Sequence, residues 1–252
     1  MEWLTETKIP LGRWIASLMD ALNEHADFVF YTISDVLEFI IENTVDLLVW
    51  LPPFLIIALF GVLAAWLHRS WKLTAFTVLS LLLIVNLGYW EATMETLALV
   101  IYATLLCMVI GVPLGVASAH RPWLYQALRP VLDLMQTIPT FVYLIPTLIL
   151  FGLGVVPGLI STVIFAIAAP IRLTHLGIAS TPKALIEAGR SFGCTPRQLL
   201  FKVELPSAMP SIMAGLTQCI MLSLSMVVIA ALVGADGLGK PVVRALNTVN
   251  IA

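Results

Sequence analysis

Residues 181–206 read TPKALIEAGRSFGCTPRQLLFKVELP, a charged segment that lies between two long uncharged ones. Thr181 is a residue type that caps helix starts, and Pro182 is of a type favoured at the first helical position. Gly193 suits the left-handed residue that commonly follows the last turn of a helix. The spacing therefore predicts a short helix between these two signals.

A second helix start follows at once. Thr195 is followed by Pro196 at the first helical position and by Gln198 at the position that completes a capping box. The charged side chains of the segment are Lys183, Glu187, Arg190, Arg197, Lys202 and Glu204. We expect two short capped helices that form a polar surface suited to docking of a partner.

The rest of the chain has the composition of a membrane protein. It is 60% hydrophobic and 11% charged, whereas a soluble domain carries about 25% charged residues. The net charge of -2 gives no basic field, so nucleic acid is not an expected partner. The three cysteines are far apart and the four histidines are scattered, so the sequence predicts neither a disulfide nor a metal site.

Uncharged runs locate the membrane spans, since a helix needs about 20 mainly apolar residues to cross the hydrocarbon core. The runs are 50–67, 73–90, 96–119, 134–171 and 205–235. The fourth run has 38 residues, and the glycines at its middle, Gly152 and Gly154, divide it into two. The sequence thus predicts six spans, with kinks expected at Pro139, Pro146 and Pro170.

The basic residues predict the orientation, because Lys and Arg favour cytoplasmic loops. If the HRSWK turn at 68–72 is cytoplasmic, six spans also place the 181–206 segment in the cytoplasm. The basic residues on that side are then Arg69, Lys72, Arg121, Arg129, Arg172, Lys183, Arg190, Arg197 and Lys202. Those on the other side are Lys8, Arg13, Lys240 and Arg244. This arrangement puts the amino terminus outside.

Residues 1–49 form a separate N-terminal segment in this interpretation. Its acidic residues Asp35, Glu38, Glu42 and Asp46 fall three and four apart, on one stripe of a helix with apolar residues on its other faces. Such a pattern is typical of an amphipathic helix that is interfacial or flanks the membrane. An acidic stripe is more often a solvated face than a contact surface. Residues 50–252 are then the transmembrane domain.

The run EAGRSFGCTPRQLLFKVELP resembles the EAA loop of ABC importer permeases, which reads Glu-Ala-Ala, three residues, Gly, nine residues, Ile, one residue, Leu-Pro. The positions that match in register are Glu187, Ala188, Gly193, Leu205 and Pro206. Gly189 stands where the motif has its second Ala, and Val203 where it has Ile, with the spacing kept. The stretches QTIPTFVYLIPTLILFGLGVVPG and FAIAAPIRLTHLGI look like the quaternary-amine branch of that family, the glycine betaine, choline, carnitine or proline betaine permeases.

The resemblance implies an all-α integral membrane protein, the type I ABC importer transmembrane domain, with kinked helices and a cytoplasmic coupling helix. It implies a homodimer in the bacterial inner membrane, contacts with lipid, ATPase subunits that bind ATP and Mg²⁺, and an extracytoplasmic substrate-binding protein. The coupling residues that it implies are Glu187, Ala188, Gly189, Gly193, Leu205 and Pro206. It also implies a further membrane helix after the segment matching GADGLGKPVVRALNTVNIA.

The chain shows no nucleotide site of its own, since GxxxxGK[ST] does not occur in it, so no cofactor is expected on it and no enzymatic activity. The residues expected to line the translocation path are Gln136, Thr137, Pro139, Thr140, Phe141 and Tyr143. Two alternatives stay open: a carrier or channel driven by an ion gradient, and a membrane scaffold that moves nothing. The predicted spans hold no Asp, Glu, Lys or Arg, which disfavours ion coupling.

Overall fold

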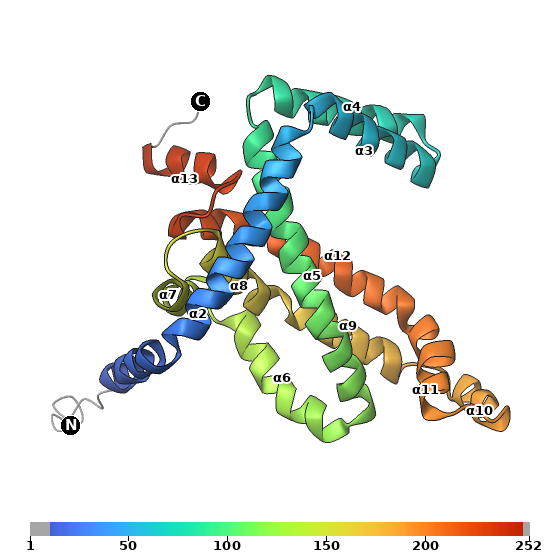
Figure 1. Cartoon of the computed structure of the whole chain (residues 1–252). Helices are drawn as coiled ribbons and strands as arrows, with labels where there is room; N and C mark the ends of the chain where they lie inside the picture. The colour runs from blue at the N-terminus through green and yellow to red at the C-terminus, as the bar shows by residue number, and fades with distance from the viewer. Residues whose placement is uncertain (1–10, 249–252) are drawn as a thin grey trace, which may run out of the picture.

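The structure, a computed structural model, describes residues 11–248, which are helices joined by short turns (Figure 1). No strand occurs in this part of the chain, so the all-α prediction is confirmed. The elements are α2 (Leu11–Trp50), α3 (Pro53–His68), α4 (Trp71–Asn86), α5 (Trp90–His120), α6 (Pro122–Thr137), α7 (Phe141–Phe151), α8 (Val155–Ala166), α9 (Ala168–Ala179), α10 (Lys183–Ser191), α11 (Pro196–Leu199), the π-helical turn η1 (Leu200–Glu204), α12 (Leu205–Ala230), the 3₁₀ turn η2 (Ala231–Val233) and α13 (Gly239–Thr248).

Three helical segments are long and apolar enough to cross a membrane on their own. They are α5, the collinear pair α8 and α9 over Val155–Ala179, and the segment Pro196–Val233 that contains α12. α9 packs against both α5 and α12. Small residues permit the close approach: a Cβ on Gly115 would lie 2.5 Å from Thr174 Cβ, and one on Gly177 would lie 3.0 Å from Ala208 Cβ.

Two further pairs of helices are long and apolar enough to cross a membrane only when the two helices of each pair are counted as one span. Residues 27–50 of α2 meet α3 at 95°, and α6 meets α7 at 97°. Proline explains both bends, because Pro52 and Pro53 end α2 and Pro139 ends α6. The described residues therefore include three helical segments long and apolar enough to span a membrane, or up to five if each bent pair is one span, and the number of six spans stays a prediction. The predicted kink at Pro139 is confirmed.

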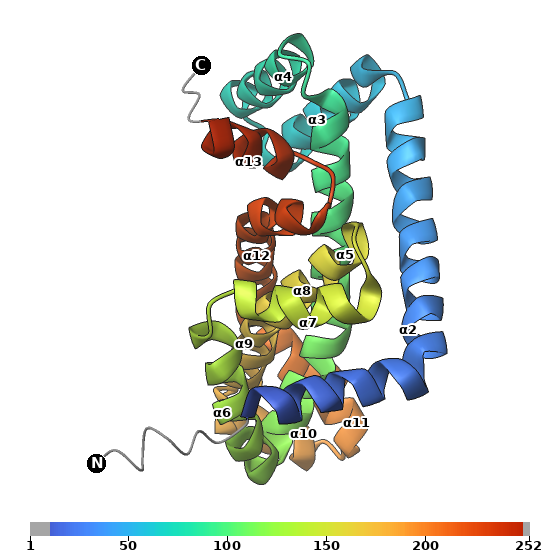
Figure 2. The ribbon, with the colours of Figure 1, turned by 90° about the vertical axis from the view of Figure 1, so that its left-hand side faces the viewer.

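The helix α2 runs beside α5 rather than apart from the membrane core (Figure 2). Ile41 of α2 is 3% exposed and packs in one cluster with Ala98, Ala103 and Leu159. The described start of α2 lies at the same end of the molecule as α10 and α11 (Figure 1). The amino terminus, which was predicted to lie on the opposite side of the membrane from the 181–206 segment, is outside the described residues. The division at residue 49 stays a prediction.

The hairpin of α3 and α4 projects sideways from the end at which α2 finishes and α5 begins (Figure 1). Ile56, Ile57, Trp90 and Met94 form the cluster that holds its base. The HRSWK turn at the tip of this hairpin lies at the opposite end of the molecule from α10 (Figure 1), although the sequence predicted the turn and residues 181–206 on one side of the membrane. The abrupt turn at Pro52 and Pro53 is the physical reason, since it sends α3 away from the axis of α2.

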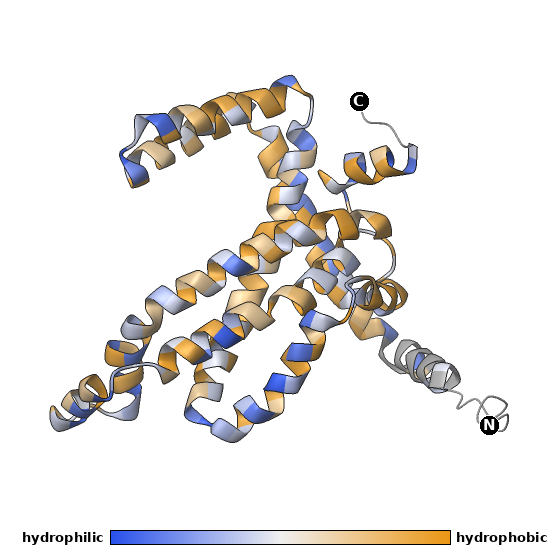
Figure 3. Ribbon diagram, turned by 180° about the vertical axis from the view of Figure 1, so that it is seen from behind, coloured by the Kyte–Doolittle hydropathy of each residue, from blue (hydrophilic) through white to orange (hydrophobic). Residues whose placement is uncertain are grey.

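The outer surface of the bundle is apolar. Orange, hydrophobic residues predominate in α3, α4 and α12, whereas blue residues concentrate on α6 and at the helix ends (Figure 3). Large exposed side chains such as Phe54, Leu79, Val109 and Met221 belong to this surface. An apolar exterior over buried small residues is the arrangement that a lipid environment requires.

Candidate functional site

The first helix of the 181–206 segment is α10, and it begins after Pro182. The N-cap is Pro182, with φ -56° and ψ 128°, and no side chain caps the helix. Thr181 is buried, and its hydroxyl donates to the carbonyl of Gly177, 3.4 Å away, in the preceding helix. The prediction that Thr181 caps α10 was therefore wrong, because that hydroxyl finds its acceptor in the last turn of α9.

The end of α10 forms as predicted. Gly193 has φ +77°, in the left-handed region, and its N–H donates to the carbonyl of Arg190 at 2.9 Å. The N–H of Cys194 donates to the carbonyl of Gly189 at 3.1 Å, so the last carbonyls of the helix are satisfied. This turn reverses the chain and sends it into α11.

Gly193→Ala is expected to open this turn more easily, because an L side chain in the left-handed region costs roughly 1–2 kcal/mol. Amide hydrogen exchange at Cys194 is expected to become roughly 5- to 30-fold faster, whereas Gly193→Asn changes it little. Equal exchange rates in the alanine and asparagine variants would show that the conformation at Gly193 does not limit the turn.

The start of α11 is a complete capping box, which confirms the prediction for this helix. The N–H of Thr195 donates to Gln198 Oε1 at 2.8 Å, and the N–H of Gln198 donates to Thr195 Oγ1 at 3.3 Å. α10 and α11 are thus short helices held in a fixed relative position by a glycine turn and a reciprocal cap.

One side of α10 combines a buried position with an exposed flank. Gly189 is buried, and a Cβ there would lie 2.8 Å from Leu199 Cδ1 and 3.4 Å from Val203 Cγ2. Beside this buried position, on the flank of the same side, Leu185 is 48% exposed and Phe192, the residue after α10, is 89% exposed, with exposed Ala188 between them. We call Leu185, Ala188 and Phe192 the outer stripe. An apolar stripe on a charged loop is the expected form of a surface that a partner covers.

Glu187 and Ala188 are exposed on α10, as a contact role requires. Leu205 and Pro206 lie within a continuous helical segment that is formed by α11, η1 and α12. Pro206 has no N–H to donate, and the π-helical turn η1 before it accommodates the missing bond, with the N–H of Leu205 donating to the carbonyl of Leu200. The loop therefore connects rigidly to α12.

The sequence missed the exposed aromatic residues of this surface. Phe192 and Phe201, which is 66% exposed, were not among the expected site residues. The sequence could have indicated this exposure. A large aromatic residue next to a charged helix end stays exposed unless another element of the chain packs over it. The spacing of Leu185, Ala188 and Phe192 by three and four residues gives the same signal.

The six residues expected to line the path gather at the elbow between α6 and α7. Gln136 and Thr137 end α6, Pro139 and Thr140 lie in the turn, and Phe141 and Tyr143 begin α7. The Tyr143 hydroxyl donates to the carbonyl of Met135 at 2.6 Å, a carbonyl near the end of α6. Tyr143 thus fixes the elbow. The elbow and the outer stripe are separate sites, and the path role of the elbow stays a prediction.

An ion pair that the sequence did not predict lies near this elbow. Arg172 Nη2 on α9 lies 2.6 Å from Asp133 Oδ1 on α6. Asp133 directly precedes the uncharged run 134–171, and Arg172 directly follows it. The two ends of that run therefore lie next to each other in the structure. Because α9 continues to Ala179, Arg172 lies inside the span Val155–Ala179. The helical segment thus extends past the uncharged run, and Arg172 lies in it with 34% of its side chain exposed.

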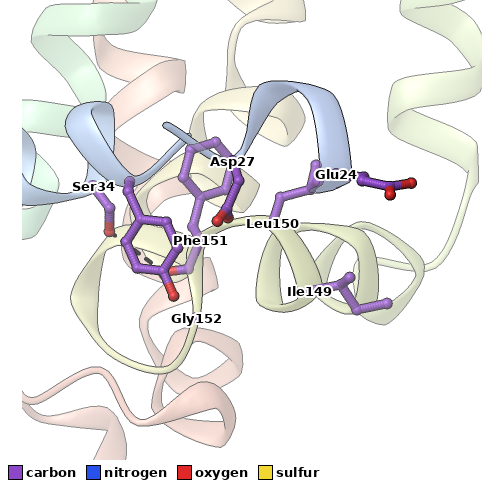
Figure 4. Close-up of a pocket in the computed structure, with 8 residues that line it drawn as sticks. Glu24, Asp27, Ser34, Ile149, Leu150, Phe151 and Gly152 are labelled. Atoms are coloured by element: carbon purple, nitrogen blue, oxygen red, sulfur yellow. Dashed lines mark hydrogen bonds between the residues drawn. The ribbon is translucent and has the colours of Figure 1, made fainter. Parts of the chain in front are cut away.

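Two hollows lie elsewhere on the structure. A cavity of about 520 Å³ is bounded by α2 and the end of α7, where the Ser34 hydroxyl donates to the carbonyl of Phe151 at 3.4 Å (Figure 4). Its carboxylates are Glu24 and Asp27. A second, of about 460 Å³, contains Glu38, Glu42, Asp46, Glu91, Glu95 and Asp236 in its lining. The acidic stripe of α2 thus faces other carboxylates. Neither hollow contains an elbow residue.

Comparison with known proteins agrees with this geometry. The chain is 46% identical over 246 residues to the glycine betaine/proline betaine transport system permease protein ProW of Escherichia coli (strain K12), covering 98% of this chain and 69% of the relative. It is 45% identical to the glycine betaine/carnitine transport permease protein GbuB of Listeria monocytogenes, covering 95% of this chain and 86% of that protein.

A solved structure of the MetNI methionine ABC transporter, in an inward-facing conformation, has a similar fold. Its TM-score is 0.56 at 26% identity, over 66% of this chain and 82% of the other. Residues 111–252, which include the elbow and the 181–206 segment, match the family model described as binding-protein-dependent transport system inner membrane component. The chain therefore belongs to this family of ABC importer permeases of the inner membrane.

Proposed function

We propose that this permease imports a quaternary amine of the glycine betaine type and is driven by a separate ATPase subunit that binds the outer stripe. The exposed apolar stripe on a rigidly closed loop, with Phe192 89% exposed, is the observation that carries the docking part. The similarity to glycine betaine permeases supports the cargo. The coupling residues are Glu187, Ala188, Gly189, Gly193, Leu205 and Pro206, with Phe192 added.

The proposed assembly contains two copies of this chain, two ATPase subunits, a substrate-binding protein on the outer side and surrounding lipid. ATP and Mg²⁺ belong to the ATPase subunits. Closure of the ATPase pair moves α10, and the continuous helical segment Pro196–Val233 carries that movement into the membrane. This chain itself performs no bond chemistry in the cycle.

The cargo is expected to pass the elbow of α6 and α7. A quaternary ammonium group donates no hydrogen bond, so the faces of aromatic rings hold it, at up to about 2 kcal/mol each when water is excluded. Phe141 is 54% exposed at the elbow, and Tyr143 lies half-buried beside it. Gln136, Thr137 and Thr140 supply polar groups for the carboxylate of a betaine. Pro139 sets the bend.

The test is uptake by vesicles that contain the permease, its ATPase and its binding protein, with glycine betaine, choline, carnitine and trimethylamine N-oxide offered separately. Glycine betaine is expected to stimulate ATP hydrolysis and to accumulate in the vesicles. The matched variant Glu187→Arg is expected to abolish uptake, while the binding protein still captures its ligand normally. Uptake that persists without ATP and follows an ion gradient would establish the carrier alternative. No flux with any solute would leave only a scaffold.

A further inference from the structure

The inner end of α5 makes a polar contact with the coupling segment. His120, the last residue of α5, has its Nε2 atom 2.8 Å from Oε2 of Glu204, the last residue of η1. Its other ring nitrogen, Nδ1, lies 2.9 Å from the carbonyl oxygen of Val116. Each ring nitrogen thus lies within hydrogen-bond distance of an oxygen atom, one a backbone carbonyl and the other a carboxylate.

Glu204 depends on this partner. Its side chain is 8% exposed, and it is the one buried acidic residue among those whose burial the structure describes. A carboxylate removed from water is costly unless it is paired, so loss of His120 leaves an uncompensated charge. Glu204 also closes the π-helical turn that precedes Pro206, and such turns are frequent at functional sites. The pair therefore joins α5 to the segment that begins at the docking surface.

A second set of contacts ties the same turns of α5 to the remaining helices. The Ser118 hydroxyl lies 3.1 Å from Nδ1 of His175 on α9. Tyr125 of α6 stacks on the His175 ring, with 3.6 Å between centroids and 7° between planes. The end of α5 is consequently attached to η1 through His120, and to α9 and α6 through Ser118. These contacts connect η1, through the end of α5, with α6, which carries one arm of the elbow.

We infer that His120 and Glu204 form a coupling latch, a pair of positioning residues that transmits movement of the docked loop to α5 and thence to the path. The inference rests on the proposed function, since it requires an ATPase at α10. It gives His120 and Glu204, which the family motif comparison did not single out, a role in the energy transfer. Without the pair, the ATPase still turns over, but α5 no longer follows.

The experiment measures substrate molecules imported per ATP hydrolysed, in vesicles that contain the complete transporter. His120→Ala and Glu204→Ala are each expected to lower this ratio roughly tenfold, a size typical of coupling between sites. The double variant is expected to match the single ones, because the pair acts as a unit. His120→Arg places a cation opposite Glu204 and is expected to restore most of the ratio. Glu204→Gln keeps the shape of the side chain but removes its charge, and it is not expected to restore the ratio.

The control is Lys240→Ala, which breaks the exposed Lys240–Asp236 ion pair of α13 and is expected to leave the ratio unchanged. A merely structural role for His120 would lower hydrolysis and uptake together through loss of folded protein. An unchanged ratio in His120→Ala, with an active wild type, would overturn the latch and leave the proposed function standing. A wild type that imports nothing at the expense of ATP would overturn both.

Discussion

Phe192→Asp is expected to abolish ATP-driven uptake while the permease still folds and inserts. The side chain is 89% exposed in the free chain, so its loss removes no internal packing. In the proposed complex it is covered by the ATPase, and a buried aromatic anchor is worth about 2 kcal/mol or more at an interface. That corresponds to roughly 30-fold weaker binding of the ATPase, with the burial of an unpaired carboxylate as a further cost.

The measurement is co-purification of the ATPase with the permease, followed by uptake in vesicles. Phe192→Leu is the matched variant, because it keeps an apolar side chain of similar reach and is expected to retain most binding. Leu185→Asp, on the same stripe, should act in the same direction. If Phe192→Asp bound the ATPase as tightly as the wild type, the outer stripe would not be the docking surface.

The local features of the coupling segment could be predicted because they depend on neighbours in sequence. Gly193 adopts the left-handed conformation, and Thr195 and Gln198 form the capping box, as the spacing indicated. Thr181 was different, since its hydroxyl chose a carbonyl of the preceding helix over the start of α10. Which acceptor the Thr181 hydroxyl contacts depends on where α9 ends. The preference of threonine for helix N-caps carries no information about that.

Features that depend on packing between distant segments could not be predicted. The uncharged run 134–171 indicated its division at Gly152 but gave no sign that Asp133 and Arg172 would pair. The acidic stripe of α2 is exposed at Asp35, Glu42 and Asp46, but no pattern in the sequence indicated that Ile41 on another face would be buried against α5 and α8. His120 and Glu204 are separated by 84 residues, and their contact follows only from the way in which α5 lies along α9 and α12.

Gly115→Ala is expected to destabilise the membrane domain more than any change at the surface of the loop. The added Cβ would lie 2.5 Å from Thr174 Cβ and 2.8 Å from the backbone oxygen of Ile171. Neither atom is the far end of a flexible side chain, so α5 and α9 must move apart. Overpacking of this kind typically costs about 1–3 kcal/mol, which lowers the melting temperature by roughly 2–12 °C for a domain of this size.

Thermal unfolding of the detergent-purified chain measures this effect, with Gly12→Ala as the matched control. A Cβ on Gly12 meets nothing within 4 Å, and alanine is the better helix former, so that variant is expected to melt at the wild-type temperature or above. Separation of α5 from α9 also moves Ser118 away from His175, so uptake should fall along with stability. Equal melting of the two alanine variants would mean that α5 and α9 are not pressed together at Gly115, and the close three-helix core of α5, α9 and α12 would have to be abandoned.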